Sequence, residues 1–94
     1  SNTTVTELDL GWTNLGKAEV PTIAQMLKKN RSITWISFYY LSIGDNEARL
    51  LYNAISNNKN SSNQTMIRTI DLSYTKISRS EKEKFAKLGI EVIY

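Results

Sequence analysis

The 94-residue chain contains no cysteine and no histidine. Without cysteine, it has neither a disulfide framework nor a thiolate that could attack a substrate or bind a metal. Without histidine, it lacks the commonest general base and the commonest protein ligand for metal ions. The composition therefore predicts a protein that is not an enzyme, with no catalytic residues, no metal and no cofactor.

Long apolar runs are also missing. No segment approaches the roughly 18 to 20 consecutive apolar residues that a membrane-spanning helix needs. The first residues lack the charged and apolar regions of a signal peptide. Together with the missing cysteines, these features predict a cytoplasmic protein that has no membrane partner.

Neither sign of charge dominates. Twelve Lys and Arg residues stand against nine Asp and Glu residues, which gives a formal net charge of +3. The basic residues are spread along the chain, so the charge does not favour nucleic acid as a partner. A basic group near the C-terminus is diluted by acidic residues and is interpreted as a solvated helix face: Lys76, Arg79, Lys82, Lys84 and Lys87.

What the chain does have is an apolar pattern that occurs three times. Residues 33–43 have apolar side chains at relative positions 1, 4, 6, 9 and 11, a spacing that fits neither a regular helix nor an alternating strand. This pattern predicts one domain over residues 3–94 with units at 5–32, 33–66 and 67–94. The three copies are Val5, Leu8, Leu10, Thr13 and Leu15; Ile33, Ile36, Phe38, Leu41 and Ile43; and Ile67, Ile70, Leu72, Thr75 and Ile77.

A helix is predicted behind each of the first two patterns. Apolar residues recur at i, i+3, i+4 and i+7, which places them on one face of a helix. Pro21 fits the first turn of the first helix, and Asn30 is a plausible residue at its end. The predicted buried faces are separated by the same offset as the two patterns: Val20, Ile23, Ala24 and Leu27, then Ala48, Leu51, Tyr52 and Ile55.

The second unit is longer than the first, because the step from Ile33 to Ile67 exceeds the step from Val5 to Ile33, so the second unit contains an insertion. The polar, low-complexity segment 57–64 predicts a mobile loop there. Ser80 and Glu83 have the spacing of a capping box at a third helix. Gly89 is expected to end that helix in a left-handed conformation, and residues 90–94 predict a closing strand.

The segments VTELDLGWTNLG, ITWISFYYLSIG and IRTIDLSYTKIS resemble ribonuclease-inhibitor-type leucine-rich repeats, and the likeness covers residues 3–88. The resemblance implies a short α/β solenoid with a parallel sheet, helices behind it and a concave face that binds proteins. In that family, position 9 usually hydrogen-bonds the turn. Thr13 and Thr75 can do so, whereas Leu41 cannot, so we expect a different turn in the middle unit. The alternative is a small α/β domain without repeats.

Position 8 of the pattern is aromatic in every unit, as Trp12, Tyr40 and Tyr74. Strands of a parallel sheet lie about 4.8 Å apart, so the three rings should form a column. Trp35 and Tyr39 widen it on the middle strand. Aromatic residues are enriched at protein-binding hot spots, so these five residues are the predicted partner-binding site. The alternative is that the rings only stack on each other and stiffen the sheet.

We therefore expect a non-enzymatic protein–protein interaction module that presents an aromatic-rich concave sheet face to a protein partner. A second hypothesis is a homo-oligomer that pairs through exposed terminal strands, residues 5–10 at one end and 90–94 at the other. A fragment of a larger leucine-rich-repeat protein is a further alternative. Asp9, Ser37 and Asp71 at position 5 are expected to have a structural role.

Overall fold

The computed structural model describes residues 6–59 and 66–94. Of the predicted loop 57–64, residues 57–59 belong to the end of a helix, and the rest lies outside the described residues. The elements are β1 (Glu7–Asp9), the 3₁₀ turn η1 (Lys17–Glu19), α1 (Val20–Lys29), β2 (Trp35–Ser37), α2 (Asp45–Lys59), β3 (Thr69–Asp71), α3 (Arg79–Ala86) and β4 (Glu91–Ile93).

The four strands form one parallel sheet in the order β1-β2-β3-β4, which confirms the α/β class. Glu7 pairs with Trp35, and Trp35 pairs with Thr69. These three residues occupy the same position of the apolar pattern, so the strands pair in the register at which the pattern recurs. Thr69 pairs in turn with Glu91, and the connection that leads to β4 is the shortest of the three.

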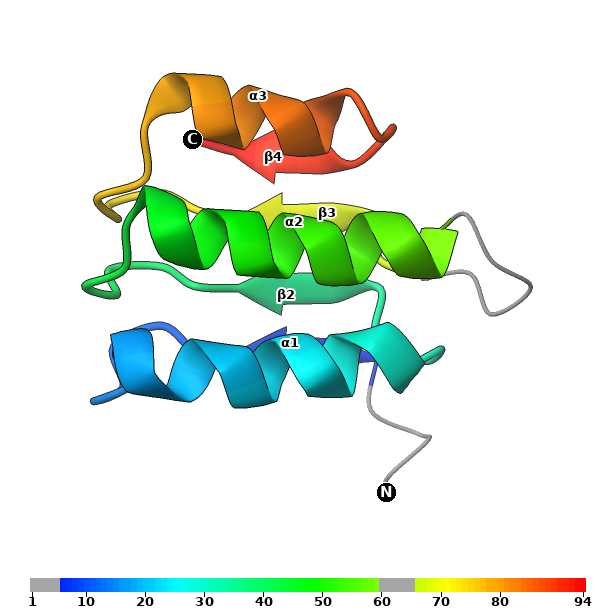
Figure 1. Cartoon of the computed structure of the whole chain (residues 1–94), viewed down its shortest axis with the longest axis horizontal. Helices are drawn as coiled ribbons and strands as arrows, with labels where there is room; N and C mark the ends of the chain where they lie inside the picture. Colours follow the sequence, from blue (N-terminus) through cyan, green and yellow to red (C-terminus); the bar gives the residue numbers. More distant parts are fainter. Residues whose placement is uncertain (1–5, 60–65) are drawn as a thin grey trace.

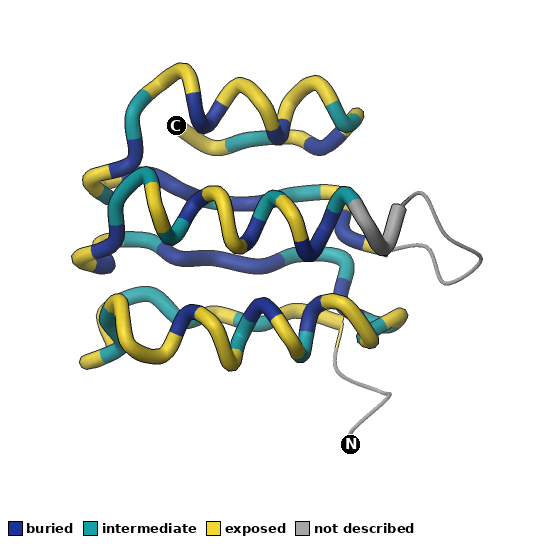
Figure 2. The backbone as a smooth tube through the Cα atoms, in the orientation of Figure 1, coloured by how far each residue is buried: buried dark blue, intermediate teal, exposed yellow. Residues whose placement is uncertain are grey.

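All three helices lie on the same side of the sheet (Figure 1). Of the two central strands, β2 has two buried residues and β3 has one, Ile70, and the rest are half-buried (Figure 2). No helix among the described residues is long and apolar enough to cross a membrane. The core joins apolar positions from every unit, among them Val20, Leu27, Ile36, Phe38, Ile43, Leu51, Ile55, Ile70, Leu72 and Phe85.

The predicted helix faces agree with the observed burial. Three of the four predicted positions on α1 are buried, and Ile23 packs against the core from its edge. On α2 three of the four predicted positions are also buried, and Tyr52 is partly buried in an edge-to-face contact with Phe85. Asn30 ends α1 as predicted, because its Oδ1 accepts hydrogen bonds from the backbone N–H groups of Ser32 and Ile33.

The start of α3 differs from the prediction. Ser80 and Glu83 do not form the capping box; instead, Ser78 is the N-cap and its Oγ accepts a hydrogen bond from the Glu81 N–H. Ser78 and Glu81 have the same spacing slightly earlier in the chain, so the sequence contains two overlapping candidates. The earlier serine becomes the cap because its backbone N–H is already held by the Asp45 carboxylate, at 2.7 Å.

The end of α3 follows the prediction. Gly89 has a φ of +87°, a left-handed conformation that glycine adopts without the clash of a Cβ atom. The chain then reverses into β4, which lies beside β3 at the sheet edge. Lys82 donates a hydrogen bond from its Nζ to the Tyr94 carbonyl oxygen at 3.0 Å, and the Arg79 guanidinium lies 4.8 Å from the centre of the Tyr94 ring. These contacts hold β4 against α3.

Candidate protein-interaction surface

The chain leaves β1, β2 and β3 through three turns of the same unusual conformation. Trp12, Tyr40 and Tyr74 have φ values of 63°, 65° and 57°, and they are the only non-glycine residues with positive φ in the described part of the chain. A left-handed conformation costs an L-amino acid about 1–2 kcal/mol, and it is rare for bulky side chains. Glycine or asparagine would suit these positions better, yet each is aromatic.

Hydrogen bonds from the preceding strand set each turn. The Asp9 carboxylate accepts from the Gly11 N–H at 2.9 Å, and the Asp71 carboxylate accepts from the Ser73 N–H at 2.9 Å. In the middle unit the Ser37 hydroxyl replaces the carboxylate and accepts from the Tyr39 N–H at 3.2 Å. The position-5 residues therefore have a structural role in fixing the backbone that leads into each aromatic residue.

The residue after each aromatic completes the turn. Thr13 donates from its hydroxyl to the Leu10 carbonyl at 2.7 Å, and Thr75 does the same to Leu72. The middle unit was expected to differ because Leu41 has no hydroxyl. That expectation is wrong at the backbone, since Tyr40 keeps the left-handed conformation. Leu41 holds the turn by burying its side chain in the core and donating its N–H to the Phe38 carbonyl.

The three turns place their rings in a row, here called the aromatic ladder: Trp12, Tyr40 and Tyr74. Trp12 and Tyr40 stack with ring centres 4.3 Å apart and planes 14° from parallel. Tyr40 and Tyr74 are 5.9 Å apart and tilted by 30°. The side chains remain 70%, 52% and 71% exposed, respectively. A continuous aromatic surface therefore lies at the ends of three strands.

Tyr39 contacts all three rings of the ladder. Its ring centre lies 5.7 Å from Trp12, 5.8 Å from Tyr40 and 5.5 Å from Tyr74, the last in an edge-to-face arrangement. Gly11 makes this packing possible, because a Cβ atom there would lie 3.0 Å from both the Tyr39 Cβ and the Tyr39 carbonyl oxygen. Tyr39 is half-buried and acts as a wedge that holds the other three rings in place.

Trp35 is the predicted site residue that does not join the ladder. No ring contact links it to the other aromatic residues of the described ranges. It lies within β2, half-buried, on the same side of the sheet as Ser37. The structure therefore joins four of the five predicted residues into one connected group of rings and places Trp35 on the adjoining sheet surface.

Stability alone does not account for the ladder. Each left-handed aromatic residue costs about 1–2 kcal/mol, whereas each favourable ring pair contributes about 0.5–1.5 kcal/mol. The two terms are of similar size, so the contacts among the rings do little more than offset the strained turns. Asparagine would relieve the strain at each turn. The ring contacts therefore do not by themselves explain why all three positions are aromatic.

The sheet surface beside the ladder carries only negative formal charges. Because Leu8, Ile36, Ile70 and Val92 pack into the core, their strand neighbours project from the other side of the sheet. This open face comprises Glu7, Asp9, Trp35, Ser37, Thr69, Asp71, Glu91 and Ile93, with no Lys or Arg. The alternation within each strand contained this signal, but only Asp9 and Asp71 were considered in the sequence, as structural residues.

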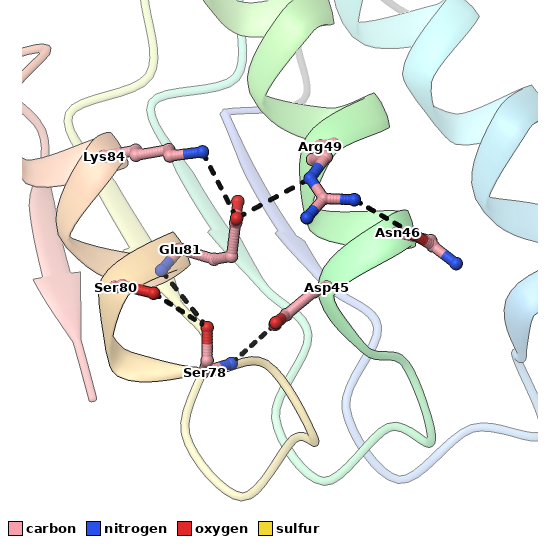
Figure 3. Close-up of polar contacts among 7 residues, drawn as sticks. All are labelled: Asp45, Asn46, Arg49, Ser78, Ser80, Glu81 and Lys84. Atoms are coloured by element: carbon pink, nitrogen blue, oxygen red, sulfur yellow. Dashed lines mark hydrogen bonds and ion pairs between the residues drawn. The ribbon is translucent and has the colours of Figure 1, made fainter.

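The ion pairs of the described residues lie on the helical side instead. Glu81, almost fully buried, is 3.6 Å from Arg49 on α2 and 3.2 Å from Lys84 on α3 (Figure 3). The hydrogen bond from the Ser78 backbone N–H lowers the pKa of Asp45 below its ordinary value of 3.8, because the bond favours the carboxylate. This polar network joins the starts of α2 and α3.

The basic residues near the C-terminus are largely engaged within the molecule. Lys82 is buried and bonded to Tyr94, Arg79 pairs with Glu83 at 3.2 Å, and Lys84 pairs with Glu81. The predicted solvated helix face therefore fits Arg79 and Lys84, which are exposed on α3, whereas Lys82 is buried.

No protein-family model matches the chain, and no match was found among curated proteins. In the described part of the chain, no group of three or more Asp or Glu side chains is arranged to hold a metal ion. The geometry of the aromatic ladder and the open face is therefore the basis for a functional proposal.

Proposed function

We propose that this chain is a short array of the ribonuclease-inhibitor leucine-rich-repeat type that acts as a non-enzymatic protein–protein interaction module. Its binding surface consists of the aromatic ladder, Tyr39 beneath it and Trp35 on the adjoining open face. The agreement between the pairing register of β1, β2 and β3 and the recurrence of the apolar pattern supports the repeat interpretation. The position of all three helices on one side leaves the other side of the sheet available for a partner.

One observation carries the proposal: three exposed aromatic residues occupy left-handed turn positions where a smaller residue would cost less. Strained conformations of this kind are retained when the side chain has a use that outweighs the strain. Exposed rings on a rigid backbone offer large contact area at a low entropic cost of binding. A pre-organised aromatic row therefore suits recognition of a protein surface.

The test is a triple substitution of the ladder, Trp12→Asn, Tyr40→Asn and Tyr74→Asn. Asparagine accepts a left-handed conformation, so circular dichroism and thermal unfolding should report an intact fold. Proteins captured from a lysate of the source cells by the unchanged chain are compared, by quantitative mass spectrometry, with those captured by the variant. We expect specific partners to disappear with the ladder.

The matched control is the triple variant Pro21→Ala, Gln25→Ala and Lys28→Ala, whose positions are exposed on α1. It alters the helical side by the same number of residues and should capture the same partners as the unchanged chain. If the ladder variant folds and its captured proteins are the same as those of the unchanged chain, the aromatic surface is not the binding site.

Self-assembly is the second candidate, and the edge at β1 favours it. Within the described residues β1 pairs with β2 alone, so the outward backbone groups of Glu7 and Asp9 have no strand partner. At the opposite edge, Lys82 and Arg79 cover the end of β4. Sedimentation velocity over a hundredfold range of concentration distinguishes the two functions. A constant monomer mass excludes self-assembly, whereas a mass that grows with concentration supports it.

A further inference from the structure

The centre of the open face has a small residue surrounded by larger ones. Ser37 is 2% exposed although its side chain points away from the helices. Trp35 precedes it at the alternate position on the same side of β2, about 7 Å away. Tyr39 follows in the turn after β2, where its backbone N–H donates a hydrogen bond to the Ser37 hydroxyl. In the sheet register, Asp9 and Asp71 lie directly on either side of it. Two rings and two carboxylates thus surround Ser37.

Asp9 and Asp71 each use one carboxylate oxygen for the turn, so the second oxygen of each can accept a hydrogen bond from a partner. In each, Oδ1 accepts the backbone hydrogen bond that fixes the following turn, and Asp71 Oδ1 also accepts from the Ser73 hydroxyl. Oδ2 of either residue accepts no hydrogen bond from the part of the chain that the structure describes. Asp9 and Asp71 lie on the two strands that flank β2, each about 4.8 Å from it, so a group above Ser37 lies between the two carboxylates.

The charge on this face has no counterpart within the described residues. Glu7, Asp9, Asp71 and Glu91 form no ion pair there, whereas Glu81 and Glu83 on α3 are paired with basic side chains. The register places none of these carboxylates directly opposite another, but four negative charges on one side of the same sheet still give this face a negative potential. Positive charge brought by a partner would be attracted by that potential, and the exposed rings would add cation–π attraction.

We propose that the open face binds a protein segment that carries arginine or lysine, with one cationic side chain seated above Ser37. Asp9 and Asp71 accept its hydrogen bonds from both sides, and Trp35 and Tyr39 flank its stem. Neighbouring apolar residues of the segment rest on the aromatic ladder. This inference rests on the proposed function, because it names the chemistry of the partner that the same surface recognises.

The test uses a phage-displayed library of random dodecapeptides, selected on the immobilised chain at low salt. The selected peptides are synthesised, and their dissociation constants are measured for four proteins. These are the unchanged chain, the open-face variant Asp9→Asn with Asp71→Asn, a helix-side control, and the ladder variant Trp12→Asn with Tyr40→Asn and Tyr74→Asn. Asparagine at positions 9 and 71 keeps the Oδ1 acceptor of each turn and removes only the charge.

The helix-side control is Glu47→Gln with Glu83→Gln. It changes the net charge by the same amount as the open-face variant. The glutamine amide introduced at position 47 retains an oxygen acceptor for the Gly44 N–H, which Glu47 holds at 2.8 Å. A general effect of net charge on cationic peptides would therefore weaken binding equally in both variants. An effect of the site would appear only in the open-face variant.

We expect the selected peptides to be enriched in arginine or lysine. Each should bind the open-face variant roughly threefold to tenfold more weakly and the control unchanged, because a partly exposed ion pair contributes modestly. Two outcomes would overturn this inference and leave the proposed function standing. In the first, the ladder variant loses peptide binding but the selected peptides are not enriched in arginine or lysine. In the second, the open-face variant and the control bind the peptides equally. Peptides that bind the ladder variant as tightly as the unchanged chain would contradict both this inference and the proposed function. A selection that yields no peptide would also contradict both. Dimerisation that the open-face variant abolishes would also overturn the inference, because it would identify a second copy as the occupant.

Discussion

The two sides of the sheet differ in how completely their side chains find partners within the molecule. On the helical side, apolar residues of every unit share one core, and the buried carboxylate of Glu81 has two basic partners. On the open face, four carboxylates have no ion pair within the described residues, and three aromatic residues are exposed in strained turns. The same strands supply both sides, because successive side chains point in opposite directions.

The core on the helical side stabilises the fold, whereas the ladder and the open face expose side chains to the solvent. Burial of apolar area on the helical side provides the main driving force for folding. The ladder adds little net stability, and the turns need only the Oδ1 acceptors of Asp9 and Asp71 and not their charge. In the proposed function, the exposed rings and these charges are the part that a binding partner would use. Substitutions in the core should therefore lower stability, whereas substitutions that remove the ladder rings, or only the charges of Asp9 and Asp71, should mainly affect binding.

The largest effect on stability is expected from the core beneath β2. Phe38 is fully buried, and Phe38→Ala leaves a cavity that should lower the free energy of unfolding by about 3–5 kcal/mol. Urea denaturation followed by circular dichroism measures the loss. A loss below about 1 kcal/mol would show that the core is not continuous at this position and would contradict the comparison.

A smaller loss is expected where the open face supports its own turn. Asp71→Ala removes the acceptor of the Ser73 N–H and the Ser73 hydroxyl, and Ser73 is itself buried. The unsatisfied groups should cost about 1–3 kcal/mol in the free energy of unfolding. Asp71→Asn keeps Oδ1 as acceptor and serves as the control. Equal losses in the two variants would mean that charge, and not the turn, is the role of Asp71.

A pH-dependent loss is expected on the helical side at Asp45. Because its pKa is lower in the folded chain than its ordinary value of 3.8, its contribution to stability is complete above 3.8. The contribution disappears as the pH falls through the lower folded value. The unfolding temperature of the unchanged chain should therefore fall more steeply below pH 3.8 than that of Asp45→Asn. Parallel pH curves would show that the bond to Ser78 has no linkage to protonation.

The smallest effect on stability is expected at the ladder. Trp12→Asn and Tyr74→Asn relieve a strained conformation while losing ring contacts, so each should change the free energy of unfolding by less than about 1 kcal/mol. Denaturant midpoints of the two variants test this. A loss of about 3 kcal/mol or more, as large as the one expected at Phe38, would make the ladder a structural element and remove the contrast between the two sides.

Much of the fold followed from the sequence because apolar spacing is a direct consequence of burial. Ile36 and Ile70 fall at equivalent positions of the pattern, and the structure pairs them across β2 and β3. The column of Trp12, Tyr40 and Tyr74 was predicted from the same register, since equivalent positions in paired strands are adjacent in space.

Other features depend on contacts that sequence spacing does not contain. Left-handed turns are predicted from glycine or asparagine, so Tyr40 gave no sign of its conformation. Leu41 was expected to alter the turn, but burial of its side chain replaces the missing hydroxyl. The cap of α3 at Ser78 depends on a hydrogen bond to Asp45, a residue far away in the sequence, which no local pattern shows.

The division between the two sides is tested most directly by amide chemical-shift mapping with a peptide selected from the library. Uniformly ¹⁵N-labelled chain is titrated with the peptide, and the shifts of every assigned amide are followed. The account predicts that the largest changes occur at Trp12, Trp35, Tyr39, Tyr40 and Tyr74, while the exposed positions of α1, α2 and α3 remain unchanged. Changes concentrated on the helices, with the ladder unaffected, would contradict it.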